Sequence, residues 1–523
     1  MAPDSANHRG KTAVLLIAPE TGRLPEDMCT LAGYISGKRG GLGDVVTALC
    51  AGLTERDIEC HLATINLKKR FQKENRMDKA EWRVLRHTMD PEKIHLVSSS
   101  IFNDLSSAYA GNPLCNAAEF QKEMVNHLIK EIRSKNKGRL ILHSHDWMAG
   151  GVITAYARSR GCPFFNTVHN VHMGYIPQEM FYGVDLDDLA NNLYFTEDRG
   201  KRCIDSHATA IKNANLINFV GKRFLHEVVE GHFADRPIIP PAVRKEVTER
   251  YYHGAVLTIT NAPSPVLYPE SCDYLVKKYG PEEEILPAKR VNLVAFQKRT
   301  GLIEDPNAIL FYWPSRLDPM QKGVELLEEI AQRFVIEHGD VQIAIVGDGV
   351  GGDRTHEEII GRIAWASGGK ITYQHFEEGL SMLGYAAAND VFGASLYEPC
   401  GQIDQVGNLF GATATNRDTG GYHDKIKELR LRMDGAERDE GNGFLFRDYD
   451  SGGLWYGLEK SVHFHRRAPE VREEQAKRIM REAREKYSIK KMIDEYIGVY
   501  EKLNGGRPLS KKKYQAFTQN FLS

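Results

Sequence analysis

The stretch AILFYWPSRLDPMQKGVELLEEIAQRFVI, residues 308–336, decides the fold that the sequence predicts. Its first part, Ala308–Ser315, is a short apolar and aromatic run of the kind found in strands that are buried on both faces. A polar turn follows, and Val324–Ile336 then repeats apolar residues at helical spacing. The residues on that shared helix face are Leu326, Leu327, Ile330 and Phe334. A buried strand followed by an amphipathic helix predicts one unit of a parallel α/β sheet.

Similar apolar runs recur on both sides of this stretch, and helical patterns separate many of them. They cover residues 12–19, 60–65, 139–145, 164–169, 214–221, 341–347, 370–376, 391–396 and 411–415. A chain of 523 residues exceeds what one hydrophobic core usually serves. We therefore expect two doubly wound, Rossmann-like α/β domains, residues 1–262 and 263–487, which face each other across a deep cleft. The break falls in the proline-containing stretch NAPSPVLY (261–268), and a final helix at about 488–523 is expected to pack back on the first domain.

Composition narrows the class of protein. Lys plus Arg (68) nearly balances Asp plus Glu (70), so the chain lacks the basic excess of nucleic-acid binders. No apolar run is long enough to span a membrane, and residues 1–11 do not resemble a secretion signal. The eight cysteines are scattered without a CxxC pair, which is typical of reduced thiols. We expect a cytoplasmic protein that binds neither nucleic acid nor membrane, and a solvated basic tail at Lys511–Lys513.

In the first half, three segments at predicted strand ends carry candidate binding groups. The glycine-rich run KRGGLGDV (38–45) precedes a helical pattern, which suits phosphate oxygens, although a structural glycine turn is an equal alternative. HSHDW (143–147) and TVHN (167–170) each place a histidine beside a polar partner. Because side chains alternate along a strand, we expect the cluster of His143, His145 and Asp146 to make a poor metal cage, and we favour a non-metal role.

In the second half, SRLDPMQKG (315–323) places an Arg and a Lys at a strand-to-helix turn, where they suit a diphosphate; a solvated turn is the alternative. The run GDGVGG (347–352) matches the GxGxxG pattern of dinucleotide sites, but a tight turn at the cleft edge explains it better, since it lies outside a first βα unit. Glu398, in YEPCG (397–401), follows an apolar strand and can accept hydrogen bonds from sugar hydroxyls.

In this order, KRGGLGDV, HSHDW, TVHN, SRLDPMQKG, EPCG (398–401) and TGG (419–421) resemble the glycogen and starch synthases, retaining glucosyltransferases with the two-domain GT-B fold. Weaker similarity at 289–302 and 486–503 extends the resemblance over most of residues 12–504. The sequence departs from the family pattern at Arg39, in the stretch 21–36, between Arg316 and Lys322, after EPCG, and at 261–264. These departures remove none of the expected catalytic groups and bear on the choice of nucleotide and acceptor.

The resemblance implies a role for each matching residue. As catalytic residues it implies Asp146, His169, Arg316, Lys322 and Glu398. Arg316 and Lys322 would neutralise the leaving diphosphate, Glu398 would hold donor-glucose hydroxyls, and Asp146 would lie near the reacting centre. As donor-binding residues it implies Lys38, Gly40, Gly41, Asp44, Asn170, Tyr373, Cys400, Gly401, Thr419, Gly420 and Gly421, with Tyr373 stacked on the base.

The resemblance implies transfer of glucose from ADP-glucose, or UDP-glucose, to the non-reducing end of an α-1,4-glucan. The partners are then the nucleotide-sugar donor and the α-glucan acceptor, and no metal or other cofactor is expected. Same-face attack explains retention better than a covalent Asp146 intermediate. Alternatives are a GT-B transferase with a small sugar or sugar-phosphate acceptor, a catalytically silent glucan-binding protein, and an NAD-dependent oxidoreductase based on GDGVGG.

Overall fold

The computed structural model describes residues 11–26, 28, 32–38, 40–88, 93–136, 138–234, 236, 238–263, 268–350, 352–430 and 440–510, with the backbone alone for 85–88. Arg39, Ser264, Gly351 and Lys511–Lys513 therefore lie outside the described residues. The chain divides into two compact units. The first comprises Met1–Val220, Leu225–Thr260 and Lys490–Ser523, and the second comprises Gly221–Phe224 and Asn261–Ile489.

The first unit is built on a seven-stranded sheet in which all neighbouring strands are parallel. Its order is β10-β9-β5-β4-β1-β2-β3. The strands are β1 Ala13–Ile17, β2 Glu59–Ile65, β3 Ile94–Val97, β4 Leu140–His145, β5 Phe164–Val168, β9 Leu216–Phe219 and β10 Val256–Thr258. A small antiparallel sheet of order β6-β8-β7 is added, made of β6 Tyr175–Pro177, β7 Phe195–Asp198 and β8 Lys201–Asp205.

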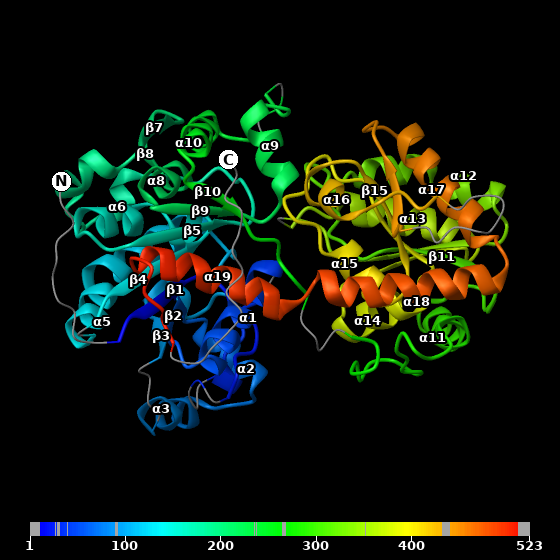
Figure 1. Cartoon of the computed structure of the whole chain (residues 1–523), viewed down its shortest axis with the longest axis horizontal. Helices are drawn as coiled ribbons and strands as arrows, with labels where there is room; N and C mark the ends of the chain where they lie inside the picture. Colours follow the sequence, from blue (N-terminus) through cyan, green and yellow to red (C-terminus); the bar gives the residue numbers. More distant parts are fainter. Residues whose placement is uncertain are drawn as a thin grey trace. The chain divides into compact units, whose positions relative to one another are not determined.

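The helices that accompany this sheet come from both ends of the chain (Figure 1). They are α1 Gly41–Glu55, α2 Lys68–Glu74, α3 Lys79–Thr88, α4 Pro113–Glu123, α5 Ile129–Lys135, α6 Val152–Ser159, α7 Leu186–Leu189, α8 Ser206–Asn213, α9 Lys222–Glu230, α10 Pro241–Tyr252 and the last helix, α19 Ile489–Leu503. The α19 helix packs on the sheet, where the Tyr500 hydroxyl lies 2.8 Å from Nδ1 of His143 in β4. Its Ile493 also contacts Gly52 of α1, at a point where a larger side chain would not fit.

The second unit is built on a six-stranded, all-parallel sheet of order β13-β12-β11-β14-β15-β16. Its strands are β11 Ile309–Trp313, β12 Val341–Val346, β13 Ile371–Gln374, β14 Asp390–Gly393, β15 Thr413–Arg417 and β16 Gly443–Phe446. Its helices are α11 Ile285–Thr300, α12 Val324–Glu337, α13 Thr355–Ala366, α14 Glu378–Ala387, α15 Ile403–Leu409, α16 Gly420–Lys425, α17 Ser451–His465 and α18 Pro469–Lys486.

The strand β11 shows why this unit needs helices on both faces of its sheet. Leu310 and Tyr312 belong to a core formed with residues of α11, α14 and α18. Ile309, Phe311 and Trp313 point the other way, into a core formed with α12 and α17. A strand that is apolar on both faces must be covered twice, and Figure 1 shows helices above and below this sheet. Within the described ranges, no helix is both long and apolar enough to cross a membrane.

Candidate active site

The predicted site residues lie where parallel strands end. In each large sheet the strand order reverses once, between β1 and β4 in the first unit and between β11 and β14 in the second. Ligands of open α/β sheets bind outside the carboxyl ends of the strands at such a point. Asp146 directly follows β4, and the turn with Arg316 and Lys322 follows β11. Glu398 follows β14, so Lys322 and Glu398 are contributed by the two strands that flank the reversal.

Lys322 and Glu398 form an ion pair with 2.6 Å between Nζ and Oε2. The Ser395 hydroxyl donates a second hydrogen bond to the same carboxylate oxygen at 3.0 Å. Burial works to raise the pKa of Glu398, but the charge and hydrogen bond of Lys322, together with Ser395, hold that pKa below its ordinary value. Glu398 is therefore an ionised, buried acceptor, oriented by two donors, as a group that holds sugar hydroxyls must be.

Arg316 belongs to the same turn but is only lightly held. Its guanidinium lies 3.3 Å from the Gln321 side-chain oxygen and 3.5 Å from Asp318, and its side chain is 52% exposed. The turn itself is fixed at Gly323, which caps α12 with a left-handed φ of 68°. A Cβ at this position would collide with the carbonyl oxygen of Ala394, so glycine lets the β11–α12 turn pack against the end of β14. The turn that carries Arg316 and Lys322 therefore packs against the end of β14, the strand that leads to Glu398.

The segments EPCG and TGG also meet. The Gly421 amide donates to the Glu398 carbonyl oxygen at 2.8 Å. Gly420 has φ +45°, and a Cβ there would overlap that same carbonyl oxygen, so the approach requires glycine. Thr419 is the N-cap residue of α16. Burial raises the pKa of the Cys400 thiol to about 11, so Cys400 forms part of a neutral wall and is no thiolate nucleophile at neutral pH.

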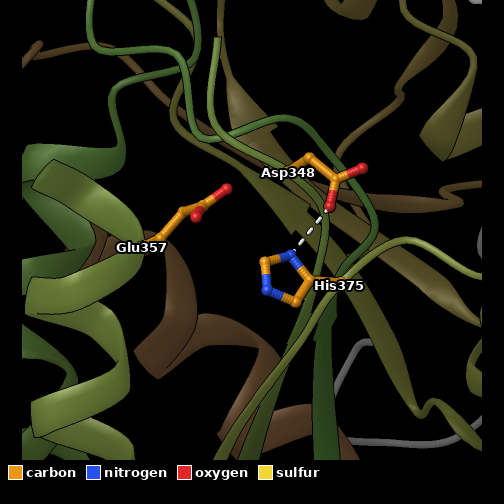
Figure 2. Close-up of side chains that lie close together, drawn as sticks. All are labelled: Asp348, Glu357 and His375. Atoms are coloured by element: carbon orange, nitrogen blue, oxygen red, sulfur yellow. Dashed lines mark hydrogen bonds and ion pairs between the residues drawn. The ribbon is translucent and has the colours of Figure 1, made fainter. Parts of the chain in front are cut away.

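Tyr373, the predicted base-stacking residue, lies in β13 beside a small polar group. Its hydroxyl is 3.3 Å from Nδ1 of His375, which is itself 3.0 Å from Oδ1 of Asp348, and Glu357 lies close by (Figure 2). Among the described residues, Asp348, Glu357 and His375 are the group whose atoms are near enough to share a metal ion. The two carboxylates already accept hydrogen bonds from protein donors. Glu357 accepts from the Gly349 amide and from Arg354. Asp348 accepts from His375 and from the Phe376 amide.

In the first unit, the glycine-rich run leads into α1 as predicted. Gly40 is the N-cap residue and the helix begins at Gly41, so the first amides of α1 are at this end of the sheet. The Lys38 ammonium and the Asp44 carboxylate, which lies in the first turn, form an ion pair at 2.7 Å. Both side chains remain partly exposed. A lysine beside a glycine-rich helix start is a combination suited to an anionic group.

Asp146 has an unusual backbone conformation, with φ 57° and ψ −170°. This region is adopted almost only by glycine, so an aspartate there is strained. Its Oδ1 accepts hydrogen bonds from the amides of His169 at 2.6 Å and Asn170 at 3.2 Å, which joins the ends of β4 and β5. Burial raises the pKa of the carboxyl to about 7, and the two amides offset part of that rise. Strain of this kind concentrates at functional sites.

The histidines at the ends of β4 and β5 lie close together. His143 and His145 are two residues apart and share one face of β4, with ring centroids 4.2 Å apart. Nδ1 of His145 lies 2.9 Å from Nε2 of His169, while His143 contacts the Thr167 and Tyr500 hydroxyls, each at 2.8 Å. Burial lowers the pKa of His169 to about 3, so it is a neutral imidazole at neutral pH.

Several residues that build the site were not predicted. Ser395 orients Glu398, and the buried Lys425 donates to the Gly401 carbonyl oxygen and to Asp404 Oδ1, the latter at 2.8 Å. Gln321 touches Arg316. Ser395 and Gln321 stand inside or beside the quoted motifs, so their position at strand ends was a usable signal. Lys425 gives no such signal, because only folding of the chain brings it next to Gly401.

The two large sheets match those of known transferases. The catalytic domain of starch synthase IV from Arabidopsis thaliana, solved with ADP and acarbose, aligns with a TM-score of 0.70 at 20% identity, covering 92% of this chain and 99% of that one. Sucrose-phosphate synthase from Thermosynechococcus elongatus aligns with a TM-score of 0.56 at 13% identity, covering 95% and 100%. The protein has the GT-B fold of glycosyltransferases, with a Rossmann-like sheet in each unit.

Sequence comparisons give similarities to glycogen and starch synthases within that class. Residues 31–236 match the family model described as "Starch synthase catalytic domain". The glycogen synthase of Finegoldia magna is 28% identical over 340 residues, which cover 62% of this chain and 66% of that protein. The glycogen synthase of Bacillus cereus (strain ATCC 10987) is 25% identical over 494 residues, which cover 89% and 97%. These matches bear out the resemblance to glycogen and starch synthases, and the chain is a glycosyltransferase.

Proposed function

We propose that the enzyme transfers glucose, with retention of configuration, from ADP-glucose to the non-reducing end of an α-1,4-glucan. UDP-glucose is the second candidate donor. The observation that carries the proposal is the buried Lys322–Glu398 pair at the strand reversal, on which the Gly420–Gly421 turn packs. A family relative solved with ADP and acarbose supports an adenine nucleotide donor and a glucan acceptor.

In this proposal Arg316 and Lys322 bind the diphosphate of the donor. Loss of a nucleoside diphosphate places negative charge on an oxygen, and fixed cations stabilise that charge more in the transition state than in the ground state. The light contacts of Arg316 leave its guanidinium able to turn towards a phosphate. Glu398, freed in part from Lys322 as the phosphates engage the ammonium, accepts hydrogen bonds from glucose hydroxyls. The Thr419–Gly421 turn contributes backbone amides, Cys400 and Gly401 the adjoining wall, and Tyr373 a ring for the base.

The first unit supplies the remaining groups. Lys38 and the amides at Gly40 and Gly41 are proposed to contact donor phosphates, with Asp44 beside them. The neutral His169 and Asn170 are proposed to position the glucose. Asp146 acts near the reacting centre by holding the amides of these two residues, and its raised pKa argues against a permanently ionised nucleophile. The acceptor hydroxyl then attacks from the same face as the leaving diphosphate. The proposal includes no metal.

The assay is release of nucleoside diphosphate from ADP-glucose or UDP-glucose, with and without glycogen primer. We expect turnover that depends on glycogen, is faster with ADP-glucose and is insensitive to EDTA. Lys322→Ala and Arg316→Ala should each lower kcat by about 10²- to 10³-fold, the scale of losing one transition-state charge partner. The matched control is Lys298→Ala, which removes an exposed lysine of the same unit.

Two outcomes contradict parts of the proposal. Turnover without any stimulation by glucan would refute the polymer acceptor and favour a small sugar or sugar phosphate. Near-normal kcat in both Lys322→Ala and Arg316→Ala, with native circular dichroism, would refute the diphosphate assignment.

A further inference from the structure

The second unit contains a basic cavity at the end of its sheet where the strands begin, opposite to the end that carries Lys322 and Glu398. Its volume is about 220 Å³, and it is lined by Ile309, the first residue of β11, by Ala308 just before it, and by Asn389 just before β14. Because the strands of this sheet are parallel, they all begin at one end of the sheet, and the turns that follow them lie at the other end. The cavity is therefore separate from the strand ends that carry Arg316, Lys322 and Glu398.

Cations dominate the lining of this cavity. Lys289, Arg290, Arg466, Arg467 and Arg472 all line it, together with a single carboxylate, Asp340. That carboxylate is already used, because Arg466 binds both of its oxygens at 3.0 and 2.6 Å. The lining thus has five formally positive side chains and one carboxylate, and that carboxylate is already paired with Arg466. Like charges without a counter-ion raise the free energy of the folded protein, and a bound anion would relieve that cost.

The least explained of these groups is Arg472. Its Nε atom is buried and has no hydrogen-bond partner within the described residues, where its guanidinium also has no ion-pair partner. Arg290 adds a like charge next to it, which lowers the pKa of Arg472 further after burial has lowered it. Arg472 is also the fourth residue of α18, near the positive end of that helix dipole. A buried donor in such a position calls for an anionic acceptor.

Two buried basic side chains beside Arg472 have lowered pKa values, with burial as the first cause. Burial lowers the pKa of Lys289 to about 7, and its ammonium contacts only carbonyl oxygens, those of Phe410 at 2.9 Å and Tyr385 at 3.4 Å. Burial, then Arg472 and Lys289, lower the pKa of His465 to about 3. The nearby Glu473 caps the α11 amides of Ile285 and Leu286 at 2.7 and 2.8 Å, so that helix end is satisfied and is not the anion site.

We propose that this cavity binds a phosphate group, either as inorganic phosphate or on a small sugar phosphate. Its volume is below the range of drug-sized ligand pockets and suits a small anion. Arg290 and Arg472 supply planar forks for phosphate oxygens, and Arg467 and Lys289 complete the positive surround. The site is distinct from the donor diphosphate site and does not depend on the proposed function.

Calorimetric titration of the full chain tests the site with two probes, inorganic phosphate and a hexose monophosphate. We expect saturable binding of at least one, weakened about tenfold or more in Arg290→Ala/Arg472→Ala, which loses two charge-assisted hydrogen bonds. Neither side chain belongs to the hydrophobic core clusters of this unit, and circular dichroism checks the fold. Arg481→Ala, on the exposed side of the same α18, should bind as the wild type does. Arg316→Ala, which removes a cation from the opposite end of the sheet, should also bind phosphate as the wild type does.

The two probes identify the source of the phosphate: a tighter hexose phosphate indicates a sugar-borne group, and equal affinities indicate phosphate alone. The proposal is overturned by equal affinity in Arg290→Ala/Arg472→Ala and wild type. It is equally overturned if Arg316→Ala abolishes binding, or if neither probe gives saturable binding in the millimolar range.

Discussion

Asp146 joins the two strand ends of the first unit by accepting two amides with one oxygen. The sequence placed it at a strand end but did not reveal its positive φ or its raised pKa, because burial in the folded chain is what raises that pKa. The same holds for Glu398. Its position after a strand could be predicted from the sequence. Its contacts with Lys322 and Ser395, which are 76 and 3 residues away, could not.

The pKa of Asp146 gives a prediction for stability. The folded carboxyl has a pKa of about 7 against 3.8 in the unfolded chain, so between these values the folded state binds more protons. Its contribution to stability therefore falls as pH rises from about 4 to 7. Asp146→Asn, which keeps an oxygen for the amides, should gain stability relative to wild type between pH 4 and 8, by up to about 4 kcal/mol.

Urea unfolding at both ends of that range measures this difference. Asp57→Asn is the matched control, because Asp57 also has a positive φ of 56° but a side chain that is 70% exposed. A gap between Asp146→Asn and wild type that stays constant with pH would contradict the assignment of a buried, neutral carboxyl.

Elements with strong apolar patterns were predicted well. The runs at 12–19, 60–65, 139–145, 164–169 and 214–221 correspond to β1, β2, β4, β5 and β9, and the five later runs correspond to β11 through β15. The short strands β3, β10 and β16 and the small antiparallel sheet were missed. Ile94–Val97 and Gly443–Phe446 have only four residues each, too few for a periodicity, and they pair at or near sheet edges through contacts that only the fold supplies.

The α19 helix shows how one element can complete a distant sheet. Arg56 of the first unit donates to Oδ1 of Asp494 through Nε at 3.0 Å and Nη2 at 2.8 Å, and both side chains are largely buried. Asp494→Ala leaves the guanidinium without its main partner, so we expect a loss of about 3 kcal/mol in the free energy of unfolding. Urea denaturation measures it. The exposed pair Lys135–Glu131 is the control, where Glu131→Ala should cost less than about 1 kcal/mol. A cost for Asp494→Ala no larger than this control would show that α19 is not anchored by the pair.

At the scale of the molecule, the fold class and the family were predicted from ordered motifs and are confirmed. The motifs could not reveal the cavity around Arg472, because its cations come from two distant stretches, 289–290 and 466–472, that no local pattern links. The final helix was expected to pack back on the first domain, and in the structure α18 lies in the second unit while the residues from Lys490 onward lie in the first.

This division predicts how fragments behave. A fragment of residues 261–489 retains the whole six-stranded sheet and its helices, so it should fold alone and unfold cooperatively in urea. A fragment of residues 1–260 lacks α19 and should show weak near-ultraviolet dichroism and no cooperative transition. Adding residues 487–510 as a separate peptide is the control for the second fragment and should restore structure. A cooperative transition in residues 1–260 without that peptide would contradict the role given to α19.

The contact between His143 and Tyr500 spans 357 residues. During synthesis the sheet that contains His143 leaves the ribosome well before its covering helix α19 is translated. The nascent chain must therefore keep the sheet face that α19 covers open while the whole second unit is made, and a chain that stops before residue 489 would expose that face permanently. The unit that is translated first thus finishes folding only after the second unit has been made, which makes its yield sensitive to chaperone supply and to premature stops.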